Sequence, residues 1–199
     1  GSQPVFHSLT QYFPNPLEAV REPWIQWQVV LPHEVEAPAY DDIRAAAYRT
    51  LDVLGMETGM SHLEWFRRPD GSLAISEVAA RPPGAQITTL ISRANDFDSV
   101  EAWARLMIFG EFQVPQRKYA VGAAYLRGQG QGKVREVLGL RQVEAEVGHL
   151  VTDVKIPNPG QEKSLSYEGE GYIILRHPDT AVVKEALNRV VSTVRVVLG

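Results

Sequence analysis

Residues 59–84 read GMSHLEWFRRPDGSLAISEVAARPPG, and this stretch decides the predicted fold around it. Apolar and polar side chains alternate on both sides of Asp70-Gly71. An Asp-Gly pair between alternating runs is a strong signal for a β-hairpin with a tight turn. A turn centred on this pair places Glu64 directly opposite Glu77. The sequence therefore predicts two cross-strand carboxylates whose Cβ atoms lie roughly 4.5–5.5 Å apart.

The two faces of the predicted hairpin differ in character. The glutamate face mixes charged and apolar groups, and Arg81 follows on it by the period of two of a strand. Like charges directly opposite each other are destabilising, so the pair needs a counter-charge. A hard divalent cation can supply it, or Arg81 can supply it as a structural salt bridge. The remaining members of the glutamate face are His62, Phe66, Ile75 and Ala79, and the opposite, apolar face consists of Leu63, Trp65, Val78 and Ala80.

The residues after the hairpin, Arg81-Pro82-Pro83-Gly84, suit an anion site. Proline biases the residue before it towards an extended backbone, so Arg81 is predicted at the end of a strand. Gly84 allows a ligand to approach the backbone closely, and a helix is expected just after it. A helix N-terminus beside an arginine can bind an anion. The alternative is that these residues form only a strand-to-helix turn.

Composition limits the function classes. The 199 residues are 44% hydrophobic and 22% charged, which is typical of a soluble globular protein of one or two domains. A net charge of −4 gives no electrostatic case for nucleic acid. The absence of cysteine excludes disulfides and thiolate zinc sites and fits a reducing cytoplasm. No apolar run approaches the roughly 18 residues of a membrane span. The opening Gly1-Ser2 resembles a tag scar ahead of a segment cut from a longer protein.

The remaining sequence predicts an α+β fold in two parts, residues 3–115 and 116–199. In the second part we expect a strand at 119–126 to pair with a return strand at 134–140 across a glycine-rich turn. That turn, GQGQGK, is not a phosphate-binding P-loop, because Arg127 and Val134 stand where a glycine and a Ser or Thr are needed. The other predicted strands are 24–31, 150–156 and 171–175, and the other predicted helices are 41–54, 99–109, 142–147, one beginning after Gly84 and one beginning at Asp179 or Thr180.

Residues 59–84 resemble the metal-binding half of the ATP-grasp superfamily, in which a Glu on one strand, a second Glu on the next and an Arg shortly after follow in order. Glu64, Glu77 and Arg81 match these positions. The wording Glu-Val-x-x-Arg-Pro-x-Gly is closest to the amino-acid ligase and biotin-carboxylase-like branch. The resemblance covers about 3–115 and, more weakly, 116–199. It implies an α+β carboxy-terminal ATP-grasp lobe, with an antiparallel sheet and helices, followed by a small α+β capping subdomain.

The function that this resemblance implies is ATP-dependent ligation of a small-molecule carboxylate and an amine to an amide, through an acyl phosphate. Glu64 and Glu77 would hold Mg²⁺ (or Mn²⁺), Arg81 would stabilise the transferred phosphoryl group, and Gly84 would lie against the nucleotide. The lysines and the glycine-rich loop of the nucleotide pocket have no counterpart here. We therefore expect amino-terminal lobes of the same protein to be partners, and this chain alone to be inactive. The sequence leaves a homodimer open.

One position departs from the family pattern. Many members carry an asparagine two residues after the second Glu as a further metal ligand, and Ala79 stands there. The predicted register places His62 opposite Ala79, where it could orient a metal-bound water or a substrate group. The alternative is a half-buried histidine whose hydrogen bonds go to the backbone.

Two other function classes remain open. Retaining glycosidases also hold two carboxyl groups about 5–5.5 Å apart, but the sequence shows no pattern of an aromatic-lined cleft, and that chemistry leaves Arg81 and Gly84 without a role. The second class is a non-catalytic module that binds an anion or a partner. Titration of Mg²⁺ with a nucleotide against Glu64→Gln and Glu77→Gln would separate this class from a ligase half-site.

Overall fold

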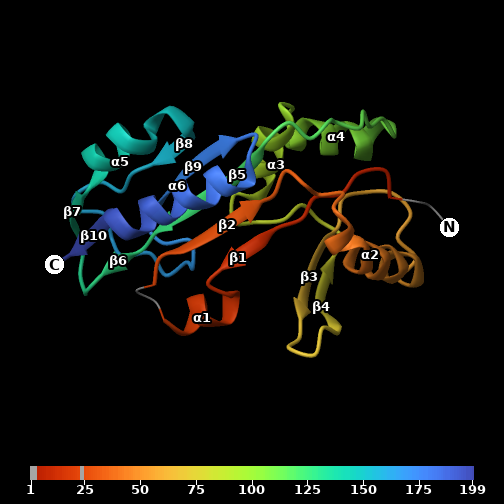
Figure 1. The fold of residues 1–199 in the computed structure, drawn as a ribbon, viewed down its shortest axis with the longest axis horizontal. Helices are drawn as coiled ribbons and strands as arrows, with labels where there is room; N and C mark the ends of the chain where they lie inside the picture. Colours follow the sequence, from red (N-terminus) through yellow and green to blue (C-terminus); the bar gives the residue numbers. More distant parts are fainter. Residues whose placement is uncertain (1–3, 23–24) are drawn as a thin grey trace.

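The computed structural model describes residues 4–22 and 25–199, so the predicted scar at Gly1-Ser2 and the Trp24 end of one predicted strand lie outside it. The described residues fold into three sheets and the helices around them (Figure 1). The largest sheet has five antiparallel strands in the order β1-β2-β5-β9-β8. A three-stranded sheet has the order β6-β10-β7, and β3 and β4 form a separate hairpin. The predicted α+β class is confirmed.

The elements have the following bounds. The strands are β1 Gln11–Phe13, β2 Trp27–Leu31, β3 His62–Arg67, β4 Leu73–Ala79, β5 Ala120–Leu126, β6 Gly128–Gln129, β7 Val134–Leu138, β8 Val151–Lys155, β9 Gly171–His177 and β10 Arg195–Leu198. The helices are α1 Pro16–Arg21, α2 Asp41–Val53, α3 Ile87–Asn95, α4 Ser99–Phe109, α5 Leu140–Val147 and α6 Thr180–Thr193, with short 3₁₀ turns at Pro38–Tyr40 and Gly148–Leu150.

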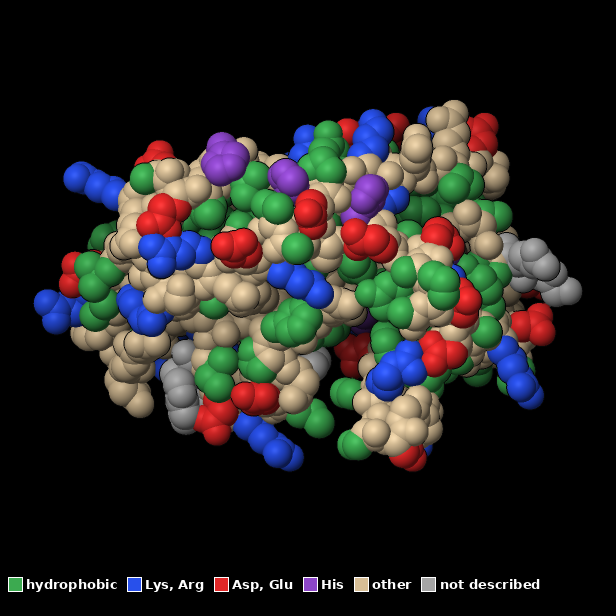
Figure 2. Space-filling model, viewed as in Figure 1, with side chains coloured by type: hydrophobic (Ala, Val, Ile, Leu, Met, Phe, Trp, Pro, Cys, Tyr) green, Lys and Arg blue, Asp and Glu red, His purple; other side chains and the backbone are tan. Residues whose placement is uncertain are grey.

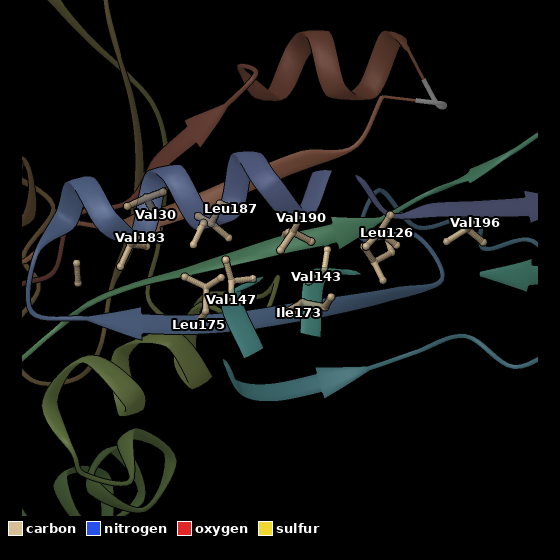
Figure 3. Packing of buried hydrophobic residues seen from close by; sticks show 14 of the residues in the cluster. Val30, Leu126, Val143, Val147, Ile173, Leu175, Val183, Leu187, Val190 and Val196 are labelled. Carbon is tan, nitrogen blue, oxygen red and sulfur yellow. The ribbon is translucent and has the colours of Figure 1, made fainter. Parts of the chain in front are cut away.

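The core lies on both faces of the five-stranded sheet. Alternate residues of each strand point to opposite faces, so Val30 packs with α5 and α6 while Val29 packs with α3. Figure 3 shows the first of these layers, in which α6 contributes Val183, Leu187 and Val190. Every residue of β5 is buried, because this central strand is covered on both faces. The sheet is therefore a rigid support for the loops at its ends.

The predicted helix starts are confirmed where a side chain caps the helix. Asp98 accepts hydrogen bonds from the backbone N–H groups of Val100 and Glu101 at the start of α4. Asp179 does the same for Ala181 at the start of α6. The predicted end of α4 at residue 109 is also confirmed, and Gly110 follows it in the left-handed conformation.

The predicted Glu64–Glu77 pairing is confirmed, but the predicted turn is wrong by one residue. The connection is a longer loop closed by the Arg68 N–H bonded to the Ser72 carbonyl, 2.8 Å away. Pairing next to the loop is therefore shifted, and a β-bulge between the pairs Trp65–Ile75 and Glu64–Glu77 restores the register. Opposite Phe66 lies Ala74 instead of the expected Ile75.

A second prediction is wrong in the carboxy-terminal part. The expected hairpin between 119–126 and 134–140 does not form, because β5 pairs with β2 and β9 while β7 pairs with β10. The residues expected to be its turn include β6, which pairs in parallel with β10. No strand was predicted after the last helix. The strand at 134–140 was therefore assigned to the strand before it and not to β10.

The five-stranded sheet takes β1 and β2 from the predicted first part and β5, β8 and β9 from the second. The boundary at 115/116 stays a prediction about organisation along the chain. Among residues 4–22 and 25–199, no helix combines the length and the apolar character needed to span a bilayer.

Candidate functional site

The five predicted site residues meet at one pocket of about 330 Å³. Its walls come from β1, α1, β2, the β3–β4 hairpin, the turn into α3 and the segment before β9, and Figure 2 shows the surface hollowed between α1 and the hairpin. The lining residues include His62, Glu64, Glu77, Arg81 and Gly84. Local pairing in the hairpin therefore delivers these groups to a single concave site.

Glu64 on β3 and Glu77 on β4 face each other across the ladder. Their side chains are 40% and 51% exposed, so water and ions can reach both carboxylates. Both are on the pocket wall, although the apolar face behind them is less buried than the sequence suggests, since Ala80 is exposed. Within the described parts of the chain, β3 and β4 pair only with each other, so the hairpin that carries the two carboxylates belongs to no larger sheet.

Arg81 supplies the positive charge beside this pair. Its Nη2 atom lies 3.6 Å from Oε1 of Glu77, and its Nη1 donates to the carbonyl of Pro82 at 3.0 Å. Both partners of the ion pair are about half exposed, so the pair itself adds little stability. The guanidinium is available to an anion in the pocket, for which its planar set of donors is well suited.

The turn from Gly84 into α3 has an unusual backbone. Ala85 and Gln86 both have positive φ angles, 51° and 58°, although neither is glycine. Such residues cost energy and persist where the surrounding structure holds them. Here the buried hydroxyl of Tyr125 donates to the carbonyl of Ala85, and the N–H of Ile87 bonds to the carbonyl of Gly84 at 2.9 Å. The helix begins at Ile87 without a capping side chain, three residues after Gly84.

His62 lies opposite Ala79, as its predicted register requires. Its side chain is 16% exposed, and its Nε2 atom is 3.6 Å from Oε1 of Glu64. The imidazole thus borders the pocket on the side of the first carboxylate. A role in orienting a bound group stays a prediction.

Three aromatic residues on the pocket wall were missed by sequence reasoning: Tyr12 on β1, Trp27 on β2 and Tyr167 in the segment before β9. Burial, with a contribution from the charge of Glu64, raises the pKa of Tyr12 to about 12. These residues lie far from the hairpin in the sequence, and no local spacing signals their convergence. They become neighbours only when β1 and β2 join the central sheet.

The donor set of the pocket suits a hard cation. Carboxylate oxygens are the ligands that Mg²⁺ prefers, and Mg²⁺ usually retains water or phosphate oxygens in its remaining positions. Within the described parts of the chain, no three or more His, Asp or Glu side chains cluster in a way that could hold a metal. Two glutamates on one wall of an open pocket fit an ion that shares its coordination with a phosphate-bearing ligand.

A larger cavity, of about 650 Å³, adjoins the site on the side of α2. It lies between the amino-terminal segment, α2, β3 and α4, and most of its lining is apolar. The residues that border both cavities are Tyr12, His62, Glu64 and Ile87, so the two spaces meet beside the first carboxylate.

No protein-family model and no curated protein sequence matches the chain. Solved structures do match its fold. The L-amino acid ligase of Bacillus licheniformis aligns with a TM-score of 0.69 and 16% identity over 86% of this chain and 46% of its own length. The N5-carboxyaminoimidazole ribonucleotide synthetase of Thermotoga maritima aligns with a TM-score of 0.64 and 18% identity over 86% of this chain and 46% of its own.

A third similar structure was solved with a nucleotide. The biotin carboxylase domain of the Hydrogenobacter thermophilus 2-oxoglutarate carboxylase, a dimer in complex with MgADP, ADP and bicarbonate, aligns with a TM-score of 0.50 and 12% identity, covering 85% of this chain and 38% of that one. The chain thus spans less than half the length of each of these three structures.

Proposed function

Because the chain shares the fold of ATP-grasp enzymes, we propose that it is part of an ATP-dependent carboxylate–amine ligase and carries that enzyme's metal- and phosphate-binding residues. The observation that supports this most is the meeting of Glu64, Glu77, Arg81 and Gly84 at one pocket. The similar structures include an L-amino acid ligase, and one was solved with MgADP.

Each residue has a specific task in this proposal. Glu64 and Glu77 would hold Mg²⁺ through carboxylate oxygens on one wall of the pocket. When bound, Mg²⁺ neutralises charge on the terminal phosphates of ATP. Arg81 donates hydrogen bonds to the phosphoryl group that moves to the substrate carboxylate. Gly84, which has no side chain, leaves its backbone open to the phosphates.

The reaction then follows the chemistry of acyl transfer. An oxygen of the substrate carboxylate attacks the γ-phosphorus of ATP, and ADP leaves with the electrons of the broken P–O bond. The amine attacks the carbonyl carbon of the acyl phosphate, loses a proton and displaces inorganic phosphate. The product is an amide. The pocket walls orient the two substrates.

The chain covers less than half of the structures it resembles, so the proposal includes further lobes of the same protein. These lobes would supply the lysines and the glycine-rich loop of the nucleotide pocket. Ligation by the isolated chain is accordingly expected to be absent or nearly so. The cysteine-free composition supports a cytoplasmic site of action.

Isothermal titration of the chain with ADP in the presence of Mg²⁺ tests the proposal. We expect Glu64→Gln and Glu77→Gln each to weaken binding by about tenfold or more, because each removes one charged oxygen ligand. Glu185→Gln, an exposed position on α6, is the matched control and should leave binding unchanged. In the longer enzyme, Glu77→Gln should abolish ligation.

Two outcomes would contradict the proposal. One is Mg²⁺-independent nucleotide binding that both glutamine variants retain, since this would indicate a non-catalytic anion-binding module. The other is full ligase turnover by the Glu77→Gln enzyme.

A further inference from the structure

One side of the pocket is an aromatic wall made of Tyr12, Trp27 and Tyr167. The ring centroids of Tyr12 and Trp27 lie 6.0 Å apart with planes 16° from parallel, and those of Trp27 and Tyr167 lie 5.6 Å apart at 54°. Trp27 is 2% exposed and stacks on the buried Tyr125 at 4.1 Å. The wall is thus anchored in the core of the five-stranded sheet.

Tyr167 comes from the carboxy-terminal part and is held in place through its backbone. The indole N–H of Trp27 donates to the carbonyl of Tyr167 at 2.7 Å. The loop that carries Tyr167 is fixed by the buried Glu170, whose carboxylate accepts hydrogen bonds from the N–H groups of Ser164 and Gly128 at 2.9 and 2.5 Å. These contacts fix the backbone and leave the ring itself free for contact.

The ring of Tyr167 reaches the phosphate side of the pocket. A Cβ built on Gly84 would lie 3.9 Å from the Tyr167 hydroxyl, which places this hydroxyl beside the turn. Tyr167 is 47% exposed, so a ligand can lie against it. Burial, with a contribution from nearby carboxylates, raises the pKa of this tyrosine, so its hydroxyl is neutral at physiological pH.

The charges of the pocket indicate what the wall can accept. Arg81 is the one arginine or lysine among the described lining residues, and phosphate would engage it. A further anion would find no cationic partner along the aromatic side. The faces of aromatic rings attract cations and pack well against flat apolar groups. An ammonium group attached to an apolar or aromatic body matches this side of the site.

We infer that the aromatic wall binds the amine substrate, and that Tyr167 selects amines with an apolar, preferably aromatic, side chain. The inference rests on the proposed ligase function and extends it to the class of amine. It also gives the carboxy-terminal part a direct role, because a residue of the segment between β8 and β9 touches the substrate.

Ligand-observed NMR titration of the chain, with Mg²⁺ and ADP present, tests this inference with 2-phenylethylamine and ethylamine as probes. We expect the wild type to bind 2-phenylethylamine more tightly than ethylamine. Tyr167→Ala should weaken 2-phenylethylamine binding by about two- to tenfold, from the usual size of one aromatic contact, and leave the affinity for MgADP unchanged. Tyr167→Phe keeps the ring and should bind like the wild type.

Leu165→Ala is the matched control, because Leu165 lies in the same loop and is fully exposed. It should change neither affinity, and circular dichroism should show that all variants are folded. Equal binding of 2-phenylethylamine by wild type and Tyr167→Ala would overturn the inference, as would no binding of this amine by a chain that binds MgADP. If Glu64→Gln loses MgADP binding in the same experiments, the ligase proposal stands even where one of these two results overturns the inference about the amine. A chain that binds the amine through Tyr167 but does not bind MgADP would support the aromatic wall and would assign nucleotide binding to the further lobes.

Discussion

Glu64 and Glu77 should stabilise a bound metal, but without the metal their mutual repulsion should lower the stability of the hairpin. Two unit charges about 5 Å apart repel by about 0.8 kcal/mol in water and by about 3 kcal/mol at an effective dielectric constant of 20. The side chains are 40% and 51% exposed, so the lower figure applies. It agrees with the roughly 0.2–1 kcal/mol found for cross-strand pairs. Replacing one glutamate by its neutral isostere therefore should stabilise the hairpin.

The substitutions Glu64→Gln and Glu77→Gln should differ in their effect on the stability of the hairpin. Glu64→Gln removes the repulsion, and the ion-pair partner of Glu64 is His62, whose Nε2 lies 3.6 Å from Oε1. Glu77→Gln removes the same repulsion but also the ion pair with Arg81, which is worth about 0.2–1 kcal/mol at such exposure. We expect Glu64→Gln to raise the free energy of opening of the hairpin by about 0.5–0.8 kcal/mol and Glu77→Gln to leave it nearly unchanged.

Amide hydrogen exchange of β3 and β4 is the appropriate assay, because this hairpin is hydrogen-bonded to no other sheet and can open locally. In low salt the amides of Glu64→Gln should exchange about two- to fourfold more slowly than those of the wild type. In about 1 M NaCl, where the Debye length is about 3 Å, the difference should disappear. Mg²⁺ with ADP at ten times the dissociation constant should stabilise the wild type by about 1.4 kcal/mol and reverse the order.

Faster exchange in Glu64→Gln than in the wild type at low salt would refute the reasoning. A gain of the same size in 1 M NaCl would also refute it, because it would come from packing or propensity and not from charge.

Two further predictions concern the support of the site. A Cβ at Gly122 on β5 would lie 2.4 Å from Cδ1 of Leu187 on α6 and 2.9 Å from the carbonyl oxygen of Val29, so Gly122→Ala should destabilise the chain by about 1–3 kcal/mol in urea unfolding. In the Gly122→Ala variant, the further substitution Leu187→Ala should lower the free energy of unfolding by less than it does in the wild type, because it removes the side chain that the new Cβ strikes. Strictly additive losses would contradict this close fit. Asp153 accepts hydrogen bonds from Arg93 at 2.7 and 2.6 Å, which lower the pKa of its carboxyl below the ordinary 3.8. This stabilisation is present above the ordinary pKa and is lost as the pH falls through the lowered one, so Asp153→Asn should destabilise at pH 7 and much less at pH 2, as measured by urea unfolding. An equal loss at both pH values would show that the ion pair does not contribute.

Local patterns predicted the hairpin pairing and the two ends of α4 well, because each depends on neighbours in the sequence. The pairing of Glu64 with Glu77, the side chain of Asp98 at the start of α4 and the left-handed Gly110 at its end all rest on contacts within a few residues or across one hairpin. The loop of the hairpin was mispredicted by one residue, and the bulge near Ser76 compensates for it. The shift of the loop and the bulge cancel each other. The predicted Glu64–Glu77 pair was therefore right although the predicted turn was wrong.

Pairing between distant strands could not be predicted in the same way. Alternation shows that Val134 to Leu138 form a strand, but it carries no information about the partner, which proved to be β10 at the end of the chain. The short, apolar β10 follows α6 directly, and its residues were indistinguishable from a continuation of that helix's apolar stripe. Partner choice depends on the burial of whole faces, here the packing of Val134 and Val196 in one core.

The sequence by itself determined the chemistry of the pocket's acidic wall: two carboxylates and an arginine, held together by the period of two of a hairpin and the turn that follows it. Only the tertiary structure decided what faces that wall. Tyr12, Trp27 and Tyr167 converge because β1 and β2 pair with each other, β2 pairs with β5, and Trp27 then binds the backbone of the Tyr167 loop. Such convergence follows from burying the two faces of a sheet, a property of the whole chain that no single segment contains.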